Sequence, residues 1–352
     1  MALEKFNADM LQLARDAREL TQSELAGASG VTQALVSKLE HGLITEPSED
    51  VVASLSSTLR FPVEFFYQQD RAVGFPHFHY RRRARMGKKE LARIEAIINI
   101  RRQHLVKLLR SYEEPVAKPI PQIDLDGSGT TPEKVAERMR AYWMLPRGPV
   151  KNLVELVEQA GGIVIANNFK TTLLDGVSFR SEGLPPLFFI NKDMPPDRAR
   201  FSLAHELGHM ILHAVPDDDA VMEAQAHRFA AEFLMPAADI RPYLKDPKLS
   251  NFARIKGFWH VSIKALIKRA YDLRMLTDYQ YKSLNIQYNK VYGGTEPQQF
   301  EHETPMRLRY IVRYHLEKLG YTIGELAKLL CFHEDDLSRV YLGRPRLSVV
   351  PP

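Results

Sequence analysis

The segment RARFSLAHELGHMILH carries the clearest chemical signal in the chain. It contains an HExxH pattern, in which His205 and His209 are four residues apart and Glu206 directly follows the first histidine. On a helix this spacing stacks the two imidazoles one turn apart, so both can bind one zinc ion. Glu206 is then placed to polarise a metal-bound water and to pass its proton to a leaving amine. We therefore predict a hydrolytic zinc site with Glu206 as general base.

The third ligand tests this interpretation, because a catalytic zinc ion normally has three protein ligands. His213 repeats the four-residue spacing, but eight residues along a helix is about 12 Å, too far for His213 to share one ion with His205. The metzincin pattern also fails, because its glycine and third histidine positions hold Leu212 and Val215.

A second helical run, VMEAQAHRFAAEFLMP, supplies the remaining options. It places Glu223 and His227 four residues apart on one face. A carboxylate from a second helix would complete a thermolysin-like set of two histidines and one glutamate, and the residue four later would brace a ligand. The alternative is that Glu223 is a solvated acid at a helix start, because the preceding PDDDAVME is acidic and loop-like.

Composition limits the class of protein. A chain of 352 residues with 45% hydrophobic and 26% charged content predicts two or three domains. A single cysteine, Cys331, excludes an intrachain disulfide and a cysteine-only zinc site. The N-terminal MALEKFNADM is polar, and no run of 18 apolar residues occurs. We therefore expect no signal peptide, no membrane partner and a cytoplasmic location.

The first seventy residues contain short helical patterns separated by turn signals. Thr21 and Glu24 have capping-box spacing, Gly30 ends that helix, and Thr32 caps the next one. Two short helices joined by a tight turn predict a helix-turn-helix, whose second helix enters the major groove of double-stranded DNA. The cap and first turns of that helix would face the DNA, namely Thr32, Gln33, Ala34, Ser37 and Lys38.

The segment TQSELAGASGVTQALVSKLEHG resembles the lambda-repressor and Cro type of helix-turn-helix, the XRE family, over roughly residues 8 to 67. The resemblance implies that Gln22 caps the approach to a phosphate. It also implies that Gln33 reads a base, since glutamine can bond bidentately to adenine. Such modules usually read DNA as dimers, so a homodimer is expected.

Positive charge is concentrated between Arg71 and Tyr112, where twelve Lys or Arg residues stand against two acids. This stretch begins with aromatic residues interleaved with Arg81, Arg82 and Arg83 and continues as a helical pattern. It could be a solvated helix that connects domains or a surface that contacts nucleic-acid phosphates. The proline- and glycine-rich residues 113–131 then predict a linker.

Four segments, DGVSF, PLFFIN, RARFSLAHELGH and EAQAHRFAAEFLMP, together resemble the ImmA/IrrE family of metallopeptidases. The resemblance extends over roughly residues 132 to 284. It implies that Glu206 is the general base and that the zinc ligands are His205, His209 and Glu223. The chain departs from the family at His227, where Asn or Asp is more common, so His227 is either a brace or an alternative ligand. Gln225 stands where many relatives have an acid, which favours Glu223 further.

The predicted fold is α+β and mostly helical, with a helix-turn-helix bundle, a zincin-like domain around a small sheet, and a C-terminal helical bundle. The expected segments are a DNA-binding domain (1–70), a basic connecting helix (71–112), a linker (113–131), a peptidase domain (132–292) and a C-terminal segment (293–352). Thr322 and Glu325 repeat the capping-box spacing in the last segment. The acidic HEDD that follows would repel phosphates, so this segment is predicted to pack or dimerise.

Two functions follow from these patterns. The first is a DNA-binding transcriptional regulator with a zinc-dependent endopeptidase domain, which cleaves a helix-turn-helix repressor in a stress or mobile-element response. The second is a non-proteolytic repressor whose peptidase-like domain senses a metal or a partner. Glu206 favours the first, because a sensor needs no general base beside its ligand. Cleavage in trans is favoured over self-cleavage within 113–131, because prolines block strand-like pairing with a cleft.

Overall fold

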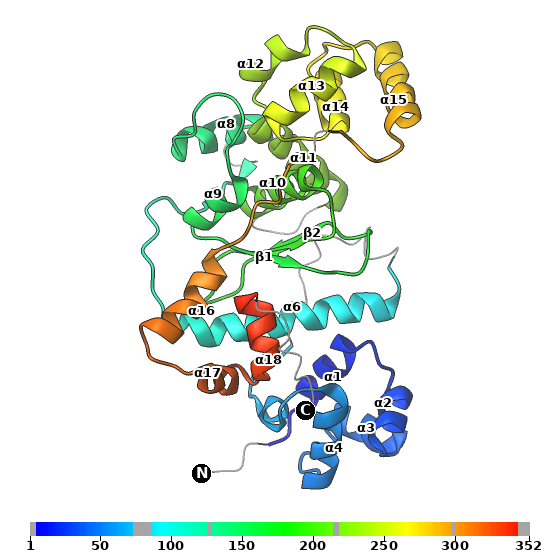
Figure 1. Cartoon of the computed structure of the whole chain (residues 1–352), viewed down its shortest axis with the longest axis vertical. Coiled ribbons are helices and arrows are strands. Elements are labelled where there is room, and N and C mark those ends of the chain that lie inside the picture. The colour runs from blue at the N-terminus through cyan, green and yellow to red at the C-terminus, as the bar shows by residue number, and fades with distance from the viewer. Residues whose placement is uncertain (1–4, 73–85, 126–128, 214–217, 298–299, 344–352) are drawn as a thin grey trace, which may run out of the picture. The chain divides into compact units, whose positions relative to one another are not determined.

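The computed structural model describes residues 5–72, 86–125, 129–213, 218–297 and 300–343. The chain forms two compact units. The first comprises Met1–Pro76, Arg81–Glu114 and Leu308–Pro352, and the second comprises His77–Tyr80 and Pro115–Arg307. The predicted fold class is confirmed, because the chain is mostly helical with a small three-stranded sheet (Figure 1). None of the helices among the described residues is long and apolar enough to span a membrane.

The first unit begins with a small bundle in which capping residues set where the helices start. Asn7 caps the first helix, Thr21 and Glu24 form a complete capping box, and Thr32 caps the third helix through the backbone N–H of Leu35. The elements are α1 (Ala8–Ala17), α2 (Gln22–Ser29), α3 (Gln33–Glu40), α4 (Glu49–Leu59) and the 3₁₀ helix η1 (Val63–Tyr67).

The basic helix α6 (Lys88–Leu109) packs against α1 and belongs to this bundle. Arg93 is buried and pairs with Glu19 at 3.0 Å, and Arg102 is buried and pairs with Asp70 at 2.9 Å. Neither interpretation of this helix from the sequence predicted these ion pairs, because the carboxylates that pair with its arginines are distant in the sequence. These two guanidinium groups stabilise the unit and do not face solvent or nucleic acid.

The C-terminal helices complete the first unit on α6. Thr322 and Glu325 form the capping box that their spacing predicted. Cys331 joins the core of the N-terminal bundle, and Tyr341 lies with its hydroxyl 2.6 Å from Nδ1 of the buried His104. The elements are α16 (Arg307–Glu317), α17 (Ile323–Leu330), α18 (Glu334–Leu337) and the short π-helical η3 (Ser338–Leu342).

The second unit is built around a sheet of strand order β1-β3-β2. The central strand β3 (Leu187–Asn191) is buried along its whole length, as its apolar run LFFIN predicts. It pairs in parallel with β1 (Ile163–Asn167) and antiparallel with β2 (Gly176–Phe179), with Val177 opposite Phe189. The strand β2 therefore forms one edge of the sheet.

Two long helices, α10 (Pro196–Leu212) and α11 (Asp219–Leu234), carry the residues of interest. Helix α10 packs against β2 and β3 on one side and against α11 on the other. The helices approach closely at Gly208, where an added Cβ would lie only 3.1 Å from the carbonyl oxygen of Ala226. Further helices surround this pair: α8 (Pro132–Tyr142), α9 (Leu153–Gln159), α12 (Ala237–Ile240), η2 (Arg241–Leu244), α13 (Leu249–Trp259), α14 (Ile263–Asp272) and α15 (Asp278–Tyr292).

Two extended segments hold this unit together. Glu303 pairs with the buried Arg200 of α10 and accepts hydrogen bonds from the first two backbone N–H groups of α9, both at 2.9 Å. Part of the predicted linker is also docked, because Ile120 donates its N–H to Ala160 and Ile123 donates its N–H to Ile211. This part of the linker is therefore held against the second unit.

Candidate functional site

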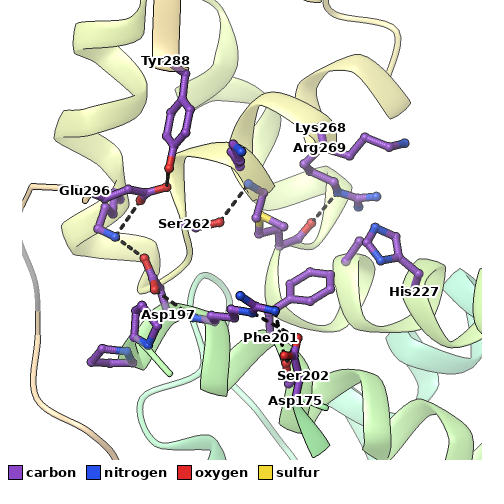
Figure 2. Close-up of a pocket in the computed structure, with 18 of the residues that line it drawn as sticks. Asp175, Asp197, Phe201, Ser202, His227, Ser262, Lys268, Arg269, Tyr288 and Glu296 are labelled. Carbon is purple, nitrogen blue, oxygen red and sulfur yellow. Dashed lines mark hydrogen bonds and ion pairs between the residues drawn. The ribbon is translucent and has the colours of Figure 1, made fainter. Parts of the chain in front are cut away.

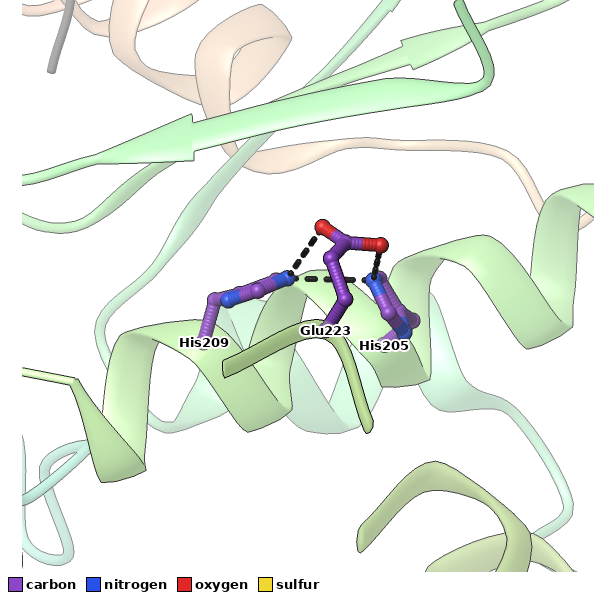
Figure 3. Close-up of side chains that lie close together, drawn as sticks. All are labelled: His205, His209 and Glu223. Carbon is purple, nitrogen blue, oxygen red and sulfur yellow. Dashed lines mark hydrogen bonds and ion pairs between the residues drawn. The ribbon is translucent and has the colours of Figure 1, made fainter. Parts of the chain in front are cut away.

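Three of the predicted residues converge in the second unit (Figure 3). His205 and His209 come from α10 with their Nε2 atoms 3.0 Å apart, and Glu223 comes from α11. The Glu223 carboxylate oxygens lie 3.2 Å from His209 Nε2 and 3.4 Å from His205 Nε2. All three ligand atoms lie within 4.8 Å of one another, so the group could hold a metal ion. Three protein donors leave a position of a tetrahedral ion open.

The electrostatics of this cluster suit a cation. Partial burial alone would raise the pKa of the Glu223 carboxyl, but the two imidazoles beside it lower that pKa below its usual range overall. Glu223 is therefore ionised at neutral pH. Both histidines are buried, so their ring nitrogens depend on neighbouring groups for partners.

His209 contacts a further histidine through its second ring nitrogen. Its Nδ1 lies 2.9 Å from Nδ1 of His213, and Nε2 of His213 lies 2.9 Å from the amide oxygen of Gln225. Burial, together with the neighbouring His209, lowers the pKa of His213 to about 4, so this imidazole is neutral at neutral pH. Since the Gln225 oxygen can only accept, His213 carries its proton on Nε2 and accepts at Nδ1. His209 then donates from Nδ1, which leaves Nε2 as the ring nitrogen that faces the cluster.

Sequence reasoning missed this chain of contacts. His213 is the residue that caps the C-terminus of α10. The eight-residue separation from His205 excludes a shared metal ion, but the four-residue spacing from His209 does predict a contact between those two rings.

Glu206 lies between α10 and the sheet and is almost fully buried. The hydroxyl of Ser178 on β2 donates to its carboxylate at 2.7 Å and also lies 3.2 Å from its backbone carbonyl. Ser178 is itself buried, so this contact fixes the carboxylate in a site that excludes bulk water. The segment DGVSF contains Ser178, but it indicated no role for this residue, because the contact joins a strand and a helix that are distant in the chain.

His227 stands apart from the cluster. Its ring packs beside that of Phe201, with the ring centroids 5.0 Å apart, one helical turn along α11 from Glu223. Among the described residues, the group that could bind a metal contains Glu223 and not His227.

The predicted DNA-facing residues form one face of α3 in the first unit. Gln33, Ala34 and Lys38 are exposed, as is the cap Thr32, and Ser37 is half-buried. Arg81, Arg82 and Arg83 lie outside the described residues.

The two glutamines of this face are linked. The Gln33 amide donates to Gln22 at 2.9 Å, and the Gln22 amide donates to Glu40 at 2.8 Å. Glu40 is fixed in turn by Arg15 of α1. This network restricts the Gln33 side chain before any DNA is bound.

Comparison with known protein families covers both regions. Residues 11–66 match the family described as helix-turn-helix. Residues 157–271 match the peptidase family described as the IrrE N-terminal-like domain. No curated protein matches the chain. Both matches agree with the resemblances to the XRE-type helix-turn-helix and to the ImmA/IrrE peptidases that the residue patterns predicted.

Proposed function

We propose that the chain is a DNA-binding transcriptional regulator whose second unit is a zinc-dependent endopeptidase. Its target is a helix-turn-helix repressor that acts in a stress or mobile-element response. The observation that carries the proposal is the convergence of His205, His209 and Glu223 inside a region that matches a peptidase family, with Glu206 next to His205 in the sequence. Two imidazoles and one carboxylate are a donor set that zinc accepts, and three donors leave a position for a substrate or water.

The ligands are His205, His209 and Glu223. When bound, zinc supplies the polarisation that makes a water molecule nucleophilic near neutral pH. His213 and Gln225 orient His209, because their hydrogen bonds keep the lone pair of its Nε2 directed into the cluster.

Glu206 is the general base and passes the proton to the leaving amine. Ser178 holds its carboxylate against β2, so the base is positioned before substrate arrives. An extended substrate would add to an edge of the small sheet through main-chain hydrogen bonds.

The first unit places the protein on DNA. Gln33 is the proposed base reader, with Thr32, Ala34, Ser37 and Lys38 on the same surface and Gln22 toward a phosphate. Arg81, Arg82 and Arg83 are proposed to contact phosphates. A homodimer would bring two such surfaces to two half-sites of an operator.

Cleavage in trans is supported by the docking of the linker. Ile120 and Ile123 are held to the second unit by backbone hydrogen bonds, and Ile120 and Leu125 are buried. A peptidase cleft needs an extended segment that is free to enter it, so this part of the linker is a poor substrate.

Fragment masses test the proposal. Zinc-loaded full-length protein and its Glu206→Gln variant are incubated with purified helix-turn-helix repressors. We expect a repressor to be cut by the wild type and left intact by the variant, because Glu206→Gln keeps the ligands and deletes the base. A zinc-dependent cut within residues 113–131 of the chain itself would overturn the trans mode. Sequence-selective DNA binding without cleavage of any repressor would favour the non-proteolytic sensor.

A further inference from the structure

A cavity of about 490 Å³ lies in the second unit (Figure 2). Helix α10 contributes Phe201 and helix α11 contributes His227 and Ala231 to its wall. Ala265 of α14 and Phe300, from the segment after α15, also line it. The volume falls in the range of cavities that bind small organic groups.

The cavity begins one helical turn from the cluster. Phe201 precedes His205 by four residues on α10, and His227 follows Glu223 by four residues on α11. Four residues advance a helix by about 6 Å, and side chains at this spacing share one face. The same two helix faces therefore carry the metal-facing atoms and continue into the cavity.

The charged groups around the cavity are neutralised by partners within the unit. The buried Lys256 ammonium lies between two carboxylates, and the other cations each pair with an acid, except Lys264, which lies over the ring of Tyr288. The pairs are Lys256 with Asp197 and Glu296, Arg269 with Glu232, Arg198 with Asp175, and Lys268 with Asp272.

Most of the remaining wall is apolar, with Ser202, His227, Ser262 and Tyr288 as its uncharged polar members. Phe201, Ala231, Ala265, Met235 and Phe300 offer carbon surface, and the carboxylates that face the cavity already have cationic partners. A cationic group placed here would lose water without gaining an unpaired counter-charge. An anionic group would find only Lys264, whose side chain is exposed to solvent and lies over the ring of Tyr288. An apolar group would lose only unfavourable contact with water.

We propose that this cavity binds an uncharged apolar side chain of the protein substrate, next to the bond that is cleaved. This inference rests on the proposed peptidase function and specifies its substrate preference. An aromatic or long aliphatic side chain would fill the volume best, so the scissile bond would lie beside a large hydrophobic residue.

Hydroxamates of small acids test the proposal on the zinc-loaded full chain, because the hydroxamate group binds the metal and the tail probes the cavity. The series is acetohydroxamate, heptanohydroxamate, 6-aminohexanohydroxamate and the monohydroxamate of adipic acid, with binding measured by calorimetry. We expect heptanohydroxamate to bind about 10- to 100-fold more tightly than acetohydroxamate, since it buries an additional aliphatic chain. The two charged tails should gain less than threefold.

Substitutions in the wall provide the second arm. Ala265→Trp, and to a smaller extent Ala265→Leu, should remove the gain of the aliphatic tail and leave acetohydroxamate binding unchanged. Ala141→Trp, at an exposed position of α8 that is not part of the cavity wall, is the matched control and should keep the gain.

The possible results distinguish the cavity proposal from the proposed metal site on which it depends. Acetohydroxamate binding without a gain for the aliphatic tail, or an equal gain in Ala265→Trp, would overturn the cavity proposal and leave the metal site intact. A larger gain for either charged tail would also overturn it. Failure of acetohydroxamate to bind zinc-loaded protein would overturn the metal site itself. If neither Ala265 variant folds, the comparison of tails on the wild type still decides the question.

Discussion

Reversing the hydrogen-bond direction at Gln225 should weaken zinc binding without touching a ligand. In the structure the Gln225 oxygen accepts from His213, which lets His209 donate from Nδ1 and keep its Nε2 lone pair for the metal. Gln225→Glu preserves an acceptor and should bind zinc as the wild type does. Gln225→Leu removes the acceptor. Gln225→Lys supplies a donor and favours the opposite tautomers, with the His209 proton on Nε2.

The magnitude follows from the burial of the two imidazoles. Leaving a buried polar group unpaired costs about 1–3 kcal/mol, and 1.4 kcal/mol corresponds to a factor of ten in affinity. The Leu variant should therefore bind zinc about 10- to 100-fold more weakly, in the range typical for groups that orient metal ligands. The Lys variant should be weaker still.

Competition with a chelating indicator at fixed pH measures these affinities, and nitrogen-15 spectra of the metal-free protein report the histidine tautomers. Ala224→Leu, an exposed neighbour on α11, is the control and should bind as the wild type does. The reasoning would be refuted if Gln225→Leu bound zinc within twofold of the wild type, or if Gln225→Lys bound as tightly as Gln225→Glu.

Three further predictions concern other parts of the chain. Ser178→Ala should lower kcat about tenfold, with KM and zinc content unchanged. Ser178→Thr should restore part of the loss, since the threonine hydroxyl can still donate to Glu206. Equal kcat in the wild type and both variants would contradict this role. Gln33→Ala should lose discrimination between DNA sites while keeping nonspecific affinity, as selection from random duplexes would reveal; an unchanged consensus motif would exclude Gln33 as the reader. Burial holds the pKa of His104 well below its usual value, so the unfolded chain binds more protons below about pH 6.5 and stability falls as pH decreases, by at most about 1.4 kcal/mol per pH unit for this group. Urea unfolding at pH 7.5 and 5.5 should show a smaller acid loss for His104→Gln, and an identical loss would count against it.

The local patterns predicted the elements that carry chemistry. The capping boxes at Thr21 and Thr322 and the helix around HExxH are present as expected, because each depends on residues within one or two turns. The choice of Glu223 over His227 for the cluster agrees with the geometry, since Glu223 reaches both imidazoles and His227 packs beside Phe201 instead.

Contacts between distant segments could not be predicted in this way. The ion pair between Arg102 and Asp70 and the hydrogen bond between Ser178 and Glu206 form only after helices and strands have packed together. The basic helix α6 shows this limit. Its charge pattern predicted arginines that face solvent or phosphates, whereas the fold buries two of them in ion pairs. Helical periodicity shows which residues share a face, and it does not show what that face packs against.

Zinc stoichiometry of matched single variants tests the central claim most directly. Full-length protein, Glu223→Ala, His227→Ala and Glu206→Gln are loaded with zinc, dialysed against a weak chelator and measured by elemental analysis. We expect about one zinc ion per chain in the wild type, His227→Ala and Glu206→Gln, and loss of most of the metal in Glu223→Ala, because among the described residues Glu223 is the one that completes the cluster. Full occupancy in Glu223→Ala together with loss of zinc in His227→Ala would contradict the account and make His227 the third ligand.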